Sequence, residues 1–280
     1  HRALIEKTQK IAQSYSVEDY ILTFEPHPRL VLQPHSDFRL LNTPIEKLKH
    51  LESLGVSNVI LIPFDIELSK LTAEDFLQLI ISKLHPKAVV IGYDHKFGKN
   101  RKGSMETFIH LNQSQNLSID LHALDEQTWE TSKISSTAIR KHIESKNISQ
   151  ANQILGYTYS LQGQVVKGKQ LGRTLGFPTA NIQVDNLHKL IPPIGIYHTE
   201  IIVQGQKYQA ATSISTNPTI SDSTDIHIES YILDFDQDIY DQDVRLSFVQ
   251  YLRDEKKFDS IDELTLAIEQ DISRIRRLTI

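Results

Sequence analysis

The feature that most constrains the fold of this sequence is a change in the spacing of its apolar residues between Leu155 and Ser160. Before this point, stretches with helical periodicity alternate with short apolar runs, which favours a parallel sheet with helices on both faces. After it, β-branched and aromatic runs are separated by Gly, Asn and Asp, which favours an antiparallel barrel. We therefore expect two domains, residues 1–156 and 157–280.

The individual elements follow from the same patterns. In the first domain, helices are expected at residues 3–15, 44–56 and 72–84, and strands at 19–28, 57–65 and 87–94. In the second, strands are expected within 160–168, 195–215, 225–235 and 243–252, followed by a helix at 260–275. Thr72 is expected to begin one helix and Gly55 to end another. Ser260 is the expected N-cap of the last helix, where Glu263 completes a capping box.

Composition limits the function classes to which the chain can belong. With 39% hydrophobic and 23% charged residues, the 280-residue sequence is that of a globular protein with ordinary cores. The absence of Cys excludes disulfides and thiolate chemistry. A net charge of −5 argues against a protein that wraps nucleic acid, and no apolar run approaches the roughly 20 residues that span a bilayer. These observations argue against a nucleic-acid or membrane partner, and they permit the cytoplasmic location that we expect.

The stretch GKQLGRTLGFPTAN, residues 168–181, combines glycines with cationic and hydroxyl side chains. From Gly163 to Lys169 the sequence begins like a P-loop, G-x-x-x-x-G-K. However, Gln170 stands where a P-loop has Ser or Thr, and the following residues continue as a loop instead of starting a helix. The match to a P-loop therefore fails at its confirming positions, which argues against a P-loop. Two interpretations stay open: a phosphate-binding loop of another geometry, or a glycine-rich hairpin with a solvated basic tip.

The phosphate-binding interpretation depends on side chains of this stretch. Lys169 and Arg173 would supply positive charge to phosphate oxygens, and the glycines let the main chain approach a ligand closely. Thr179 and Asn181 offer the hard oxygen ligands that Mg²⁺ prefers. Pro178 fixes φ just before these two residues, so the turn that aims them is partly ordered in advance.

Several motifs, taken together, resemble a known enzyme family over almost the whole chain. GKQLGRTLGFPTAN, ESYILDFDQDIY and YLRDEKKFDS are similar to the riboflavin kinase domain, and TFEPHP, GYDHKFG and ISSTAIR are similar to the flavin adenylyltransferase domain. In this order, the two halves resemble the bacterial bifunctional riboflavin kinase/FAD synthetases. The resemblance implies a nucleotidyltransferase-type, Rossmann-like α/β domain at residues 1–156, and a β-barrel kinase domain with a C-terminal helix at residues 157–280.

For the kinase reaction, the resemblance implies that ATP, with Mg²⁺, phosphorylates riboflavin to FMN. It assigns Glu229 as the base for the riboflavin 5′-hydroxyl, with the carboxylate presented inward by a strand, and Thr179 and Asn181 as ligands of Mg²⁺. Arg253 is the expected riboflavin contact. The ATP phosphates are assigned to the glycine-rich stretch, through Gly168, Lys169, Gly172, Arg173, Thr174, Gly176 and Pro178. The alternative for Glu229 is a strand carboxylate that faces water.

For adenylyl transfer, the resemblance implies that the phosphate of FMN attacks the α-phosphate of a second ATP and releases pyrophosphate, without a covalent enzyme intermediate. The ATP triphosphate is assigned to a helix N-terminus with Ser135, Ser136, Thr137 and Arg140. The nucleotide side is assigned to Gly92 and Asp94, and the flavin side to His27 and Pro28. The alternatives are a plain N-cap with a surface Arg, and a loop His without a catalytic task.

The sequence departs from the family pattern at its start. Families of this kind use an H-x-G-H pair, in which both histidines stabilise the charge that develops on the α-phosphate, and only the last His can be present, as His1. Because the chain begins there without Met and enters a helical pattern at once, we expect further residues upstream. His95 and Lys96 also replace the usual aromatic residue and Arg, and Ser215 stands where Gly is more frequent.

Two further hypotheses compete with a bifunctional enzyme. One is a riboflavin kinase alone, with a degenerate first domain, and the other is a flavin-binding carrier that does no chemistry. The joint presence of Thr179, Asn181 and Glu229 argues against a carrier, because storage needs neither metal ligands nor a base.

Overall fold

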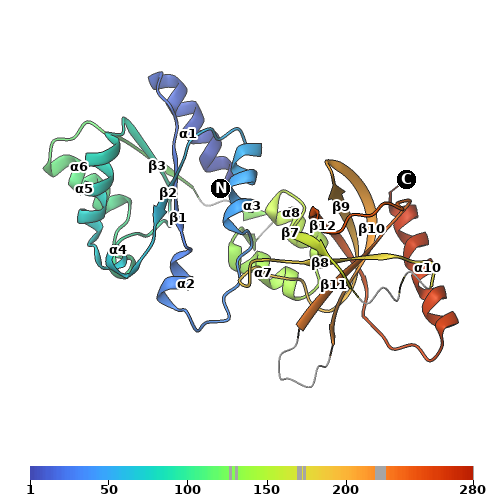
Figure 1. The fold of residues 1–280 in the computed structure, drawn as a ribbon. Helices are drawn as coiled ribbons and strands as arrows, with labels where there is room; N and C mark the ends of the chain where they lie inside the picture. The colour runs from blue at the N-terminus through green and yellow to red at the C-terminus, as the bar shows by residue number, and fades with distance from the viewer. Residues whose placement is uncertain (126–127, 130–131, 169–171, 173–174, 218–224, 280) are drawn as a thin grey trace. The chain divides into compact units, whose positions relative to one another are not determined.

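The computed structural model describes the chain except for residues 126–127, 130–131, 169–171, 173–174, 218–224 and 280 (Figure 1). The residues divide into two units. The N-terminal unit comprises residues 1–38 and 42–133, and the barrel unit comprises residues 39–41 and 134–280. Each unit has its own hydrophobic core.

The N-terminal unit alternates helices and strands, as its sequence predicts. β1 pairs with β2 and β3 pairs with β4, both in parallel, whereas β5 and β6 form a short antiparallel pair. The described helices are α1 (Arg2–Tyr15), α2 (Pro28–Leu32), α3 (Pro44–Ser53), α4 (Ile66–Lys70), α5 (Ala73–Leu84), the 3₁₀ helix η1 (Lys99–Arg101) and α6 (Met105–Ser114). The described strands are β1 (Ile21–Glu25), β2 (Val59–Pro63), β3 (Ala88–Gly92), β4 (Asp120–Leu124), β5 (Thr128–Trp129) and β6 (Ser132–Lys133).

Capping residues determine where two of these helices begin and end. Thr72 Oγ1 accepts a hydrogen bond from the Asp75 N–H at 3.1 Å and begins α5, as the sequence predicts. At the start of α3, Thr43 and Glu46 form a reciprocal capping box. Gly55 adopts φ +77° just after the C-cap of α3, the conformation in which glycine commonly ends a helix.

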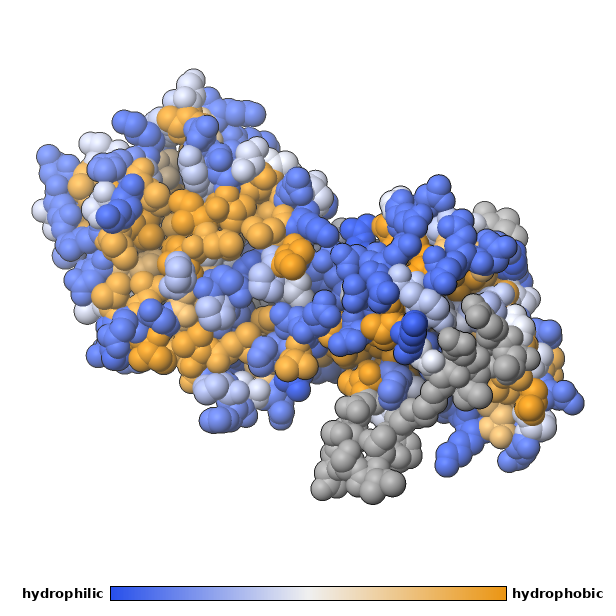
Figure 2. All heavy atoms as spheres, viewed as in Figure 1, coloured by the Kyte–Doolittle hydropathy of each residue, from blue (hydrophilic) through white to orange (hydrophobic). Residues whose placement is uncertain are grey.

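The two sheet pairs of the N-terminal unit differ in how well they are covered. Leu77 of α5 and Phe108 of α6 are buried in a core that also packs against β3 and β4. On β1 and β2, in contrast, Leu22 and Leu61 are 39% and 41% exposed. Figure 2 shows apolar side chains gathered on the visible face of this unit. The β1–β2 pair therefore leaves more of its apolar surface uncovered than the β3–β4 pair does.

Six strands in the described part of the barrel unit close in the order β10, β11, β8, β7, β12, β9, and every neighbouring pair is antiparallel. The strands are β7 (Ser160–Val166), β8 (Thr179–Gln183), β9 (Gly195–Val203), β10 (Gln206–Asn217), β11 (Asp225–Ile232) and β12 (Asp243–Arg253). The described helices are α7 (Ser136–Glu144), α8 (Ile148–Leu155) and α10 (Ile261–Leu278). The predicted fold class, a Rossmann-like parallel-sheet domain followed by an antiparallel barrel and a C-terminal helix, is confirmed.

The start of α10 agrees with the sequence prediction in one bond and differs in the other. Ser260 Oγ accepts the Glu263 N–H at 3.2 Å, so Ser260 is the N-cap. The Glu263 carboxylate accepts the N–H of Asp259 at 3.3 Å, instead of the N–H of Ser260 that a capping box requires. The returning bond is therefore displaced by one residue.

Side chains fill the interior of the barrel. Tyr197, Leu246 and Phe248 are fully buried there. On β11, Ile228 and Ser230 are 3% and 0% exposed, so the residues between them point to the outer face. The interior of the barrel is thus a packed core.

Helices α7 and α8 contribute to the same core, with Ile143 and Ile148 almost fully buried in it. Residues 39–41 also join this unit, because the Leu40 N–H donates to His188 O at 2.6 Å and the Leu190 N–H donates to Leu40 O at 2.9 Å. The units therefore divide between residues 133 and 134. The sequence places the division after residue 156, where the periodicity changes. That change does not show with which unit α7 and α8 pack.

Candidate active sites

Oxygen-bearing side chains gather on the outer face of the barrel where β8 pairs with β11. In this antiparallel pair, Glu229 lies directly opposite Asn181, and Tyr231 lies opposite Thr179. Thr179 is therefore the diagonal neighbour of Glu229, and its Oγ1 donates a hydrogen bond to Glu229 Oε2 at 3.1 Å. Strand pairing thus brings together the expected base and both expected metal ligands.

The direction of the Glu229 side chain differs from the sequence expectation. Its neighbours Ile228 and Ser230 occupy the barrel interior, so the partly exposed Glu229 points outward. The interior leaves no space for a substrate at this point, because Ser230 Oγ is hydrogen-bonded to Thr212 Oγ1 at 2.7 Å within the core. The expectation of an inward-facing carboxylate is corrected: this site lies on the outer face.

Two glycines of the glycine-rich stretch lie against the expected metal ligands. A Cβ added to Gly168 would lie 2.2 Å from Asn181 Nδ2 and 2.5 Å from its Oδ1. A Cβ added to Gly172 would lie 2.3 Å from the carbonyl oxygen of Phe177 and 3.5 Å from Thr179 Oγ1. Any larger residue at either position would displace these atoms, so the close approach requires glycine.

The described part of this stretch forms a tight turn before β8. The N–H groups of Leu175 and Phe177 both donate to Gly172 O, at 3.1 and 2.9 Å. Gly176 adopts φ +83°, and the exposed Pro178 directly precedes the strand. Lys169, Arg173 and Thr174, which the sequence analysis assigned to ATP, lie outside the described residues.

The chemistry of the donors at this site fits a magnesium ion. Thr179 offers a hydroxyl oxygen and Asn181 an amide oxygen, and the Glu229 carboxylate adds negative charge beside them. Among the described residues, no group of three or more His, Cys, Asp or Glu side chains could hold a metal. The neutral oxygens of Thr179 and Asn181 suit an ion that takes its remaining ligands from water and phosphate.

Arg253, the expected riboflavin contact, pairs β12 with the C-terminal helix. Its Nε donates to Asp271 Oδ1 and Oδ2 at 3.2 and 3.1 Å, and its Nη2 donates to Asp271 Oδ2 at 2.8 Å. Its Nη1 donates to Asp254 O at 3.1 Å. Asp271 is buried, so this forked ion pair fixes the guanidinium in place.

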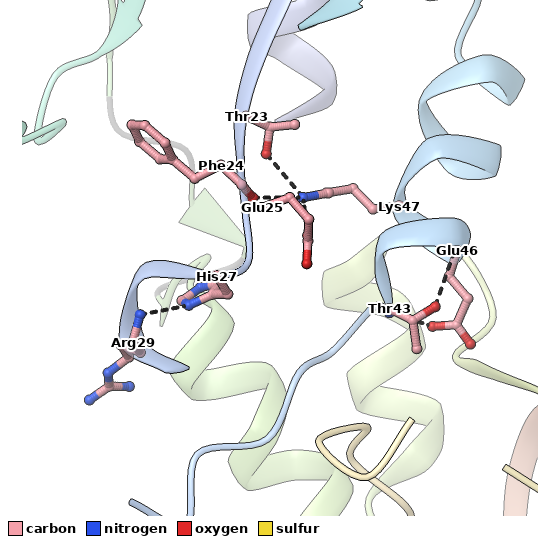
Figure 3. A network of polar contacts seen from close by, with 8 residues as sticks. All are labelled: Thr23, Phe24, Glu25, His27, Arg29, Thr43, Glu46 and Lys47. Atoms are coloured by element: carbon pink, nitrogen blue, oxygen red, sulfur yellow. Dashed lines mark hydrogen bonds and ion pairs between the residues drawn. The ribbon is translucent and has the colours of Figure 1, made fainter. Parts of the chain in front are cut away.

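In the N-terminal unit, the expected flavin contacts follow the carboxyl end of β1 (Figure 3). His27 is the N-cap of α2, and its Nδ1 accepts the Arg29 N–H at 3.1 Å. Its ring centroid lies 4.8 Å from that of Phe38. Pro28 occupies the first turn of α2, where a missing N–H has no cost. His27 and Pro28 therefore both have structural roles at the start of α2, and a flavin-binding role would be additional to these.

Lys47 is a polar residue of this region that the sequence analysis did not single out. It extends from α3 to the end of β1, where its Nζ donates to Thr23 Oγ1 at 3.1 Å and to Phe24 O at 3.3 Å (Figure 3). The same Nζ lies 3.6 Å from Glu25 Oε2. These contacts join residues more than twenty positions apart, so no local motif could have indicated them.

The loop after β3 carries the expected nucleotide contacts. Gly92 is the last residue of β3, and Asp94 is exposed two residues later. Burial lowers the pKa of the neighbouring His95, while Asp94 opposes this shift. His1, at the N-cap position of α1, is exposed.

The ISSTAIR motif lies in the barrel unit, at the start of α7. Ser135 is the N-cap, and its side chain accepts the Ala138 N–H at 3.2 Å. Ser136 and Thr137 are exposed in the first turn. Arg140 Nε donates to Arg39 O at 2.8 Å, so this side chain also fixes the segment 39–41. Ser135 and Arg140 therefore each make a structural contact. Local sequence could indicate only the contact of Ser135, because an N-cap bond joins residues close together in the chain.

Comparisons with known proteins match the two halves of the chain to two enzyme families. The FAD synthetase family matches residues 1–138, and the riboflavin kinase family matches residues 155–279. A bifunctional riboflavin kinase/FMN adenylyltransferase from Listeria monocytogenes is 35% identical over 272 residues, which cover 97% of this chain and 85% of the relative. The chain belongs to this bifunctional riboflavin kinase/FMN adenylyltransferase family.

Other relatives span both regions of the family. The enzyme of the same description from Bacillus subtilis is 31% identical over 274 residues, covering 97% of this chain and 85% of the relative. A crystal structure described as a macrolide-efflux protein from Streptococcus pneumoniae has a TM-score of 0.89 and 31% identity, and covers 99% of this chain and 89% of that chain. In the described part of this family member, no helix combines the length and apolar character needed to cross a membrane.

Proposed function

We infer that this chain phosphorylates riboflavin with ATP to give FMN, and transfers the adenylyl group of a second ATP to FMN to give FAD and pyrophosphate. Matches to both family regions and to bifunctional relatives support the two reactions. One observation carries the assignment of the kinase site: Thr179 donates to Glu229, while Asn181 lies opposite Glu229 on the paired strand. Strand pairing thus holds the two proposed metal ligands and the proposed base together.

In the kinase reaction, we assign Glu229 as the general base. The 5′-hydroxyl oxygen of riboflavin attacks the γ-phosphorus of ATP, the bond from this phosphorus to the β–γ bridging oxygen breaks, and ADP leaves. The hydroxyl proton passes to the Glu229 carboxylate. Because Thr179 already donates to Oε2, the carboxylate is oriented before the substrate binds.

We assign Thr179 Oγ1 and Asn181 Oδ1 as the protein ligands of Mg²⁺. When bound, the ion neutralises charge on the phosphate oxygens of ATP. Gly168 and Gly172 let the main chain approach those phosphates, and the remainder of the ATP stretch is assigned to Lys169, Arg173, Thr174, Gly176 and Pro178. Arg253 is assigned to the riboflavin side, with a guanidinium that Asp271 already orients.

For adenylyl transfer, an oxygen of the FMN phosphate attacks the α-phosphorus of ATP, and pyrophosphate leaves. We assign the triphosphate to the N-terminus of α7, where free N–H groups and the exposed Ser136 and Thr137 hydroxyls can donate to it. Ser135 and Arg140 orient that helix start and add donors. The remaining assignments are Gly92 and Asp94 to the nucleotide, His27 and Pro28 to the flavin, and His1 to the α-phosphate charge.

Incubation of the purified protein with riboflavin, ATP and Mg²⁺, followed by chromatographic separation of the flavins, tests both reactions. The expected products are FMN first and FAD later, with pyrophosphate released in step with FAD. FMN without FAD would reduce the activity to that of a riboflavin kinase. Bound but unchanged riboflavin would contradict both assignments and indicate a carrier.

A further inference from the structure

Tyr231 lies beside the proposed kinase site, yet the mechanism gives it no task. It follows Glu229 by two residues on β11, so both side chains lie on the outer face of the barrel. Across the strand pair, Tyr231 is directly opposite Thr179. This aromatic ring is therefore a neighbour of both the proposed base and a proposed metal ligand.

One side of Tyr231 is fixed by the hydrophobic cluster beneath the C-terminal helix. Tyr231 packs against the cluster formed by Leu233, Leu252 and Ile275, which are 5%, 6% and 0% exposed. Leu252 belongs to β12 and Ile275 to α10, so the cluster joins two further elements to the face on which Tyr231 packs. Tyr231 is thus partly buried against the hydrophobic core on this side.

The other side of Tyr231 meets the glycine-rich stretch. Its ring contacts that of Phe177 edge to face, with centroids 5.5 Å apart and an interplanar angle of 77°. The Phe177 N–H donates to Gly172 O at 2.9 Å, and the Phe177 carbonyl oxygen is the atom that lies 2.3 Å from an added Gly172 Cβ. Gly172 in turn lies beside Thr179. A fixed Phe177 therefore fixes the end of the stretch next to the metal ligand.

We propose that Tyr231 is a positioning residue of the kinase reaction, which holds Gly172 against Thr179 through Phe177 and so sets the affinity for ATP. The inference rests on the proposed function of the glycine-rich stretch as the ATP phosphate loop. The hydrogen bond between Thr179 and Glu229 involves neither the Tyr231 ring nor the Phe177 ring. The effect therefore falls on ATP binding and spares proton transfer to Glu229.

The test compares four single variants of the full chain: Tyr231→Leu, Tyr231→Phe, Phe177→Leu and, as a matched control, Tyr208→Leu. Tyr208 forms an edge-to-face pair of the same kind with Phe235, at 4.9 Å and 72°, elsewhere on the barrel. Each variant is assayed for the KM of ATP and the kcat of riboflavin phosphorylation, for FAD formation from supplied FMN, and for melting temperature. Calorimetry with a non-hydrolysable ATP analogue and Mg²⁺ measures binding without turnover.

Tyr231→Leu and Phe177→Leu are expected to raise the KM of ATP and the Kd of the analogue by about 2- to 10-fold, the affinity equivalent of one edge-to-face contact. The kcat and FAD formation should stay near wild type. Tyr231→Phe should behave as wild type, because it keeps the ring, and Tyr208→Leu should leave the KM of ATP unchanged. The double variant Tyr231→Leu/Phe177→Leu should raise the KM no more than the worse single variant does.

Three results would overturn the proposal. The first is an unchanged KM of ATP and an unchanged Kd of the analogue in Phe177→Leu. This variant removes the ring contact but keeps the packing of Tyr231 against its own cluster. The second is a loss in Tyr231→Phe as large as that in Tyr231→Leu, which would assign the effect to the hydroxyl group. The third is an equal fall in FAD formation, which would indicate a general loss of structure. Failure of the wild-type protein to form FMN in the same assay would instead refute the proposed function.

Discussion

The Thr179 hydroxyl donates a hydrogen bond to Glu229 Oε2 across 3.1 Å, between two strands that are far apart in the sequence. A hydroxyl has one proton to donate and lone pairs that accept. With its proton directed to Glu229, the Thr179 oxygen keeps lone pairs for a cation. One side chain can therefore orient the proposed base and bind the proposed metal at the same time.

The first prediction tests these two tasks together. Thr179→Val keeps the shape of the side chain but removes the oxygen, so kinase turnover should fall by about 10²-fold or more, because a bound metal supplies several kcal/mol of charge stabilisation. Thr179→Ser keeps the oxygen and should retain most activity. Initial rates of FMN formation over a magnesium titration measure the kinase activity of both variants. A fully active Thr179→Val enzyme would exclude this residue from the metal site, and FAD formation from supplied FMN serves as the internal control.

The second prediction concerns the glycine that lies against Asn181. In Gly168→Ala, the new Cβ would lie 2.2 Å from Asn181 Nδ2, so the amide must move and the magnesium requirement of the kinase should rise about 10- to 100-fold, as when a residue that orients a metal ligand is changed. Gly205→Ala is the control, since nothing lies within 4 Å of its added Cβ although its φ is +80°. It should lower the melting temperature without altering the magnesium titration. Equal magnesium curves for Gly168→Ala and wild type would contradict the prediction.

Sequence patterns predicted the fold because its two halves use different local periods. Helix caps such as Thr72 and Ser260 were also predictable, since each satisfies N–H groups within a few residues. The face to which Glu229 points was not. Alternation along a strand shows that Ile228 and Glu229 face opposite sides, but only closure of the barrel determines which side is the core.

Contacts between distant segments also escaped sequence reasoning. Lys47 reaches the end of β1, and Arg140 reaches the carbonyl of Arg39, about a hundred residues away in the chain. Neither contact leaves a local pattern. For the same reason, the sequence could not show that α7 and α8 pack with the barrel. Their helical pattern continues that of the first half, whereas the burial of Ile143 and Ile148 in the barrel core depends on the fold alone.

The third prediction tests the division of the chain. Residues 157–280 remain the predicted kinase domain, but this fragment lacks α7 and α8, and it leaves uncovered the core residues that Ile143 and Ile148 pack against. Burial of one such side chain contributes about 1.5–3 kcal/mol, so a fragment of residues 134–280 should be more stable by about 3 kcal/mol or more. Urea unfolding of the two fragments measures the difference. Equal free energies of unfolding would mean that α7 and α8 do not stabilise the barrel. Riboflavin phosphorylation by each fragment checks that the fragment is folded.

The fourth prediction concerns Arg140, which is bonded to Arg39 O and is also assigned to the ATP triphosphate. Arg140→Ala should lower FAD formation by about 10²–10³-fold if the guanidinium donates to the charge that develops on phosphate, and should spare riboflavin phosphorylation. Melting temperature separates this effect from the structural one, because loss of the bond to Arg39 alone would weaken the barrel unit. A lower melting temperature with unchanged FAD formation at subsaturating ATP would make Arg140 a structural residue.

The kinase mechanism depends on the last prediction, that Glu229 accepts the proton of the riboflavin 5′-hydroxyl. Glu229→Gln keeps the shape of the side chain and can still accept a hydrogen bond from Thr179, so riboflavin and ATP binding should stay within a few-fold of wild type. Turnover should fall by about 10²–10⁴-fold, the usual contribution of a positioned general base, with kcat and kcat/KM reduced together.

Asp234→Asn is the matched control for this prediction. Asp234 follows the same strand, but its Oδ1 is paired with Arg276 Nη2 at 2.5 Å, so this change should affect the attachment of α10 and leave the chemical step intact. Greater damage from Asp234→Asn than from Glu229→Gln, in folded proteins, would mean that Glu229 is the wrong carboxylate. Full activity of both variants would mean that the hydroxyl loses its proton to phosphate or water.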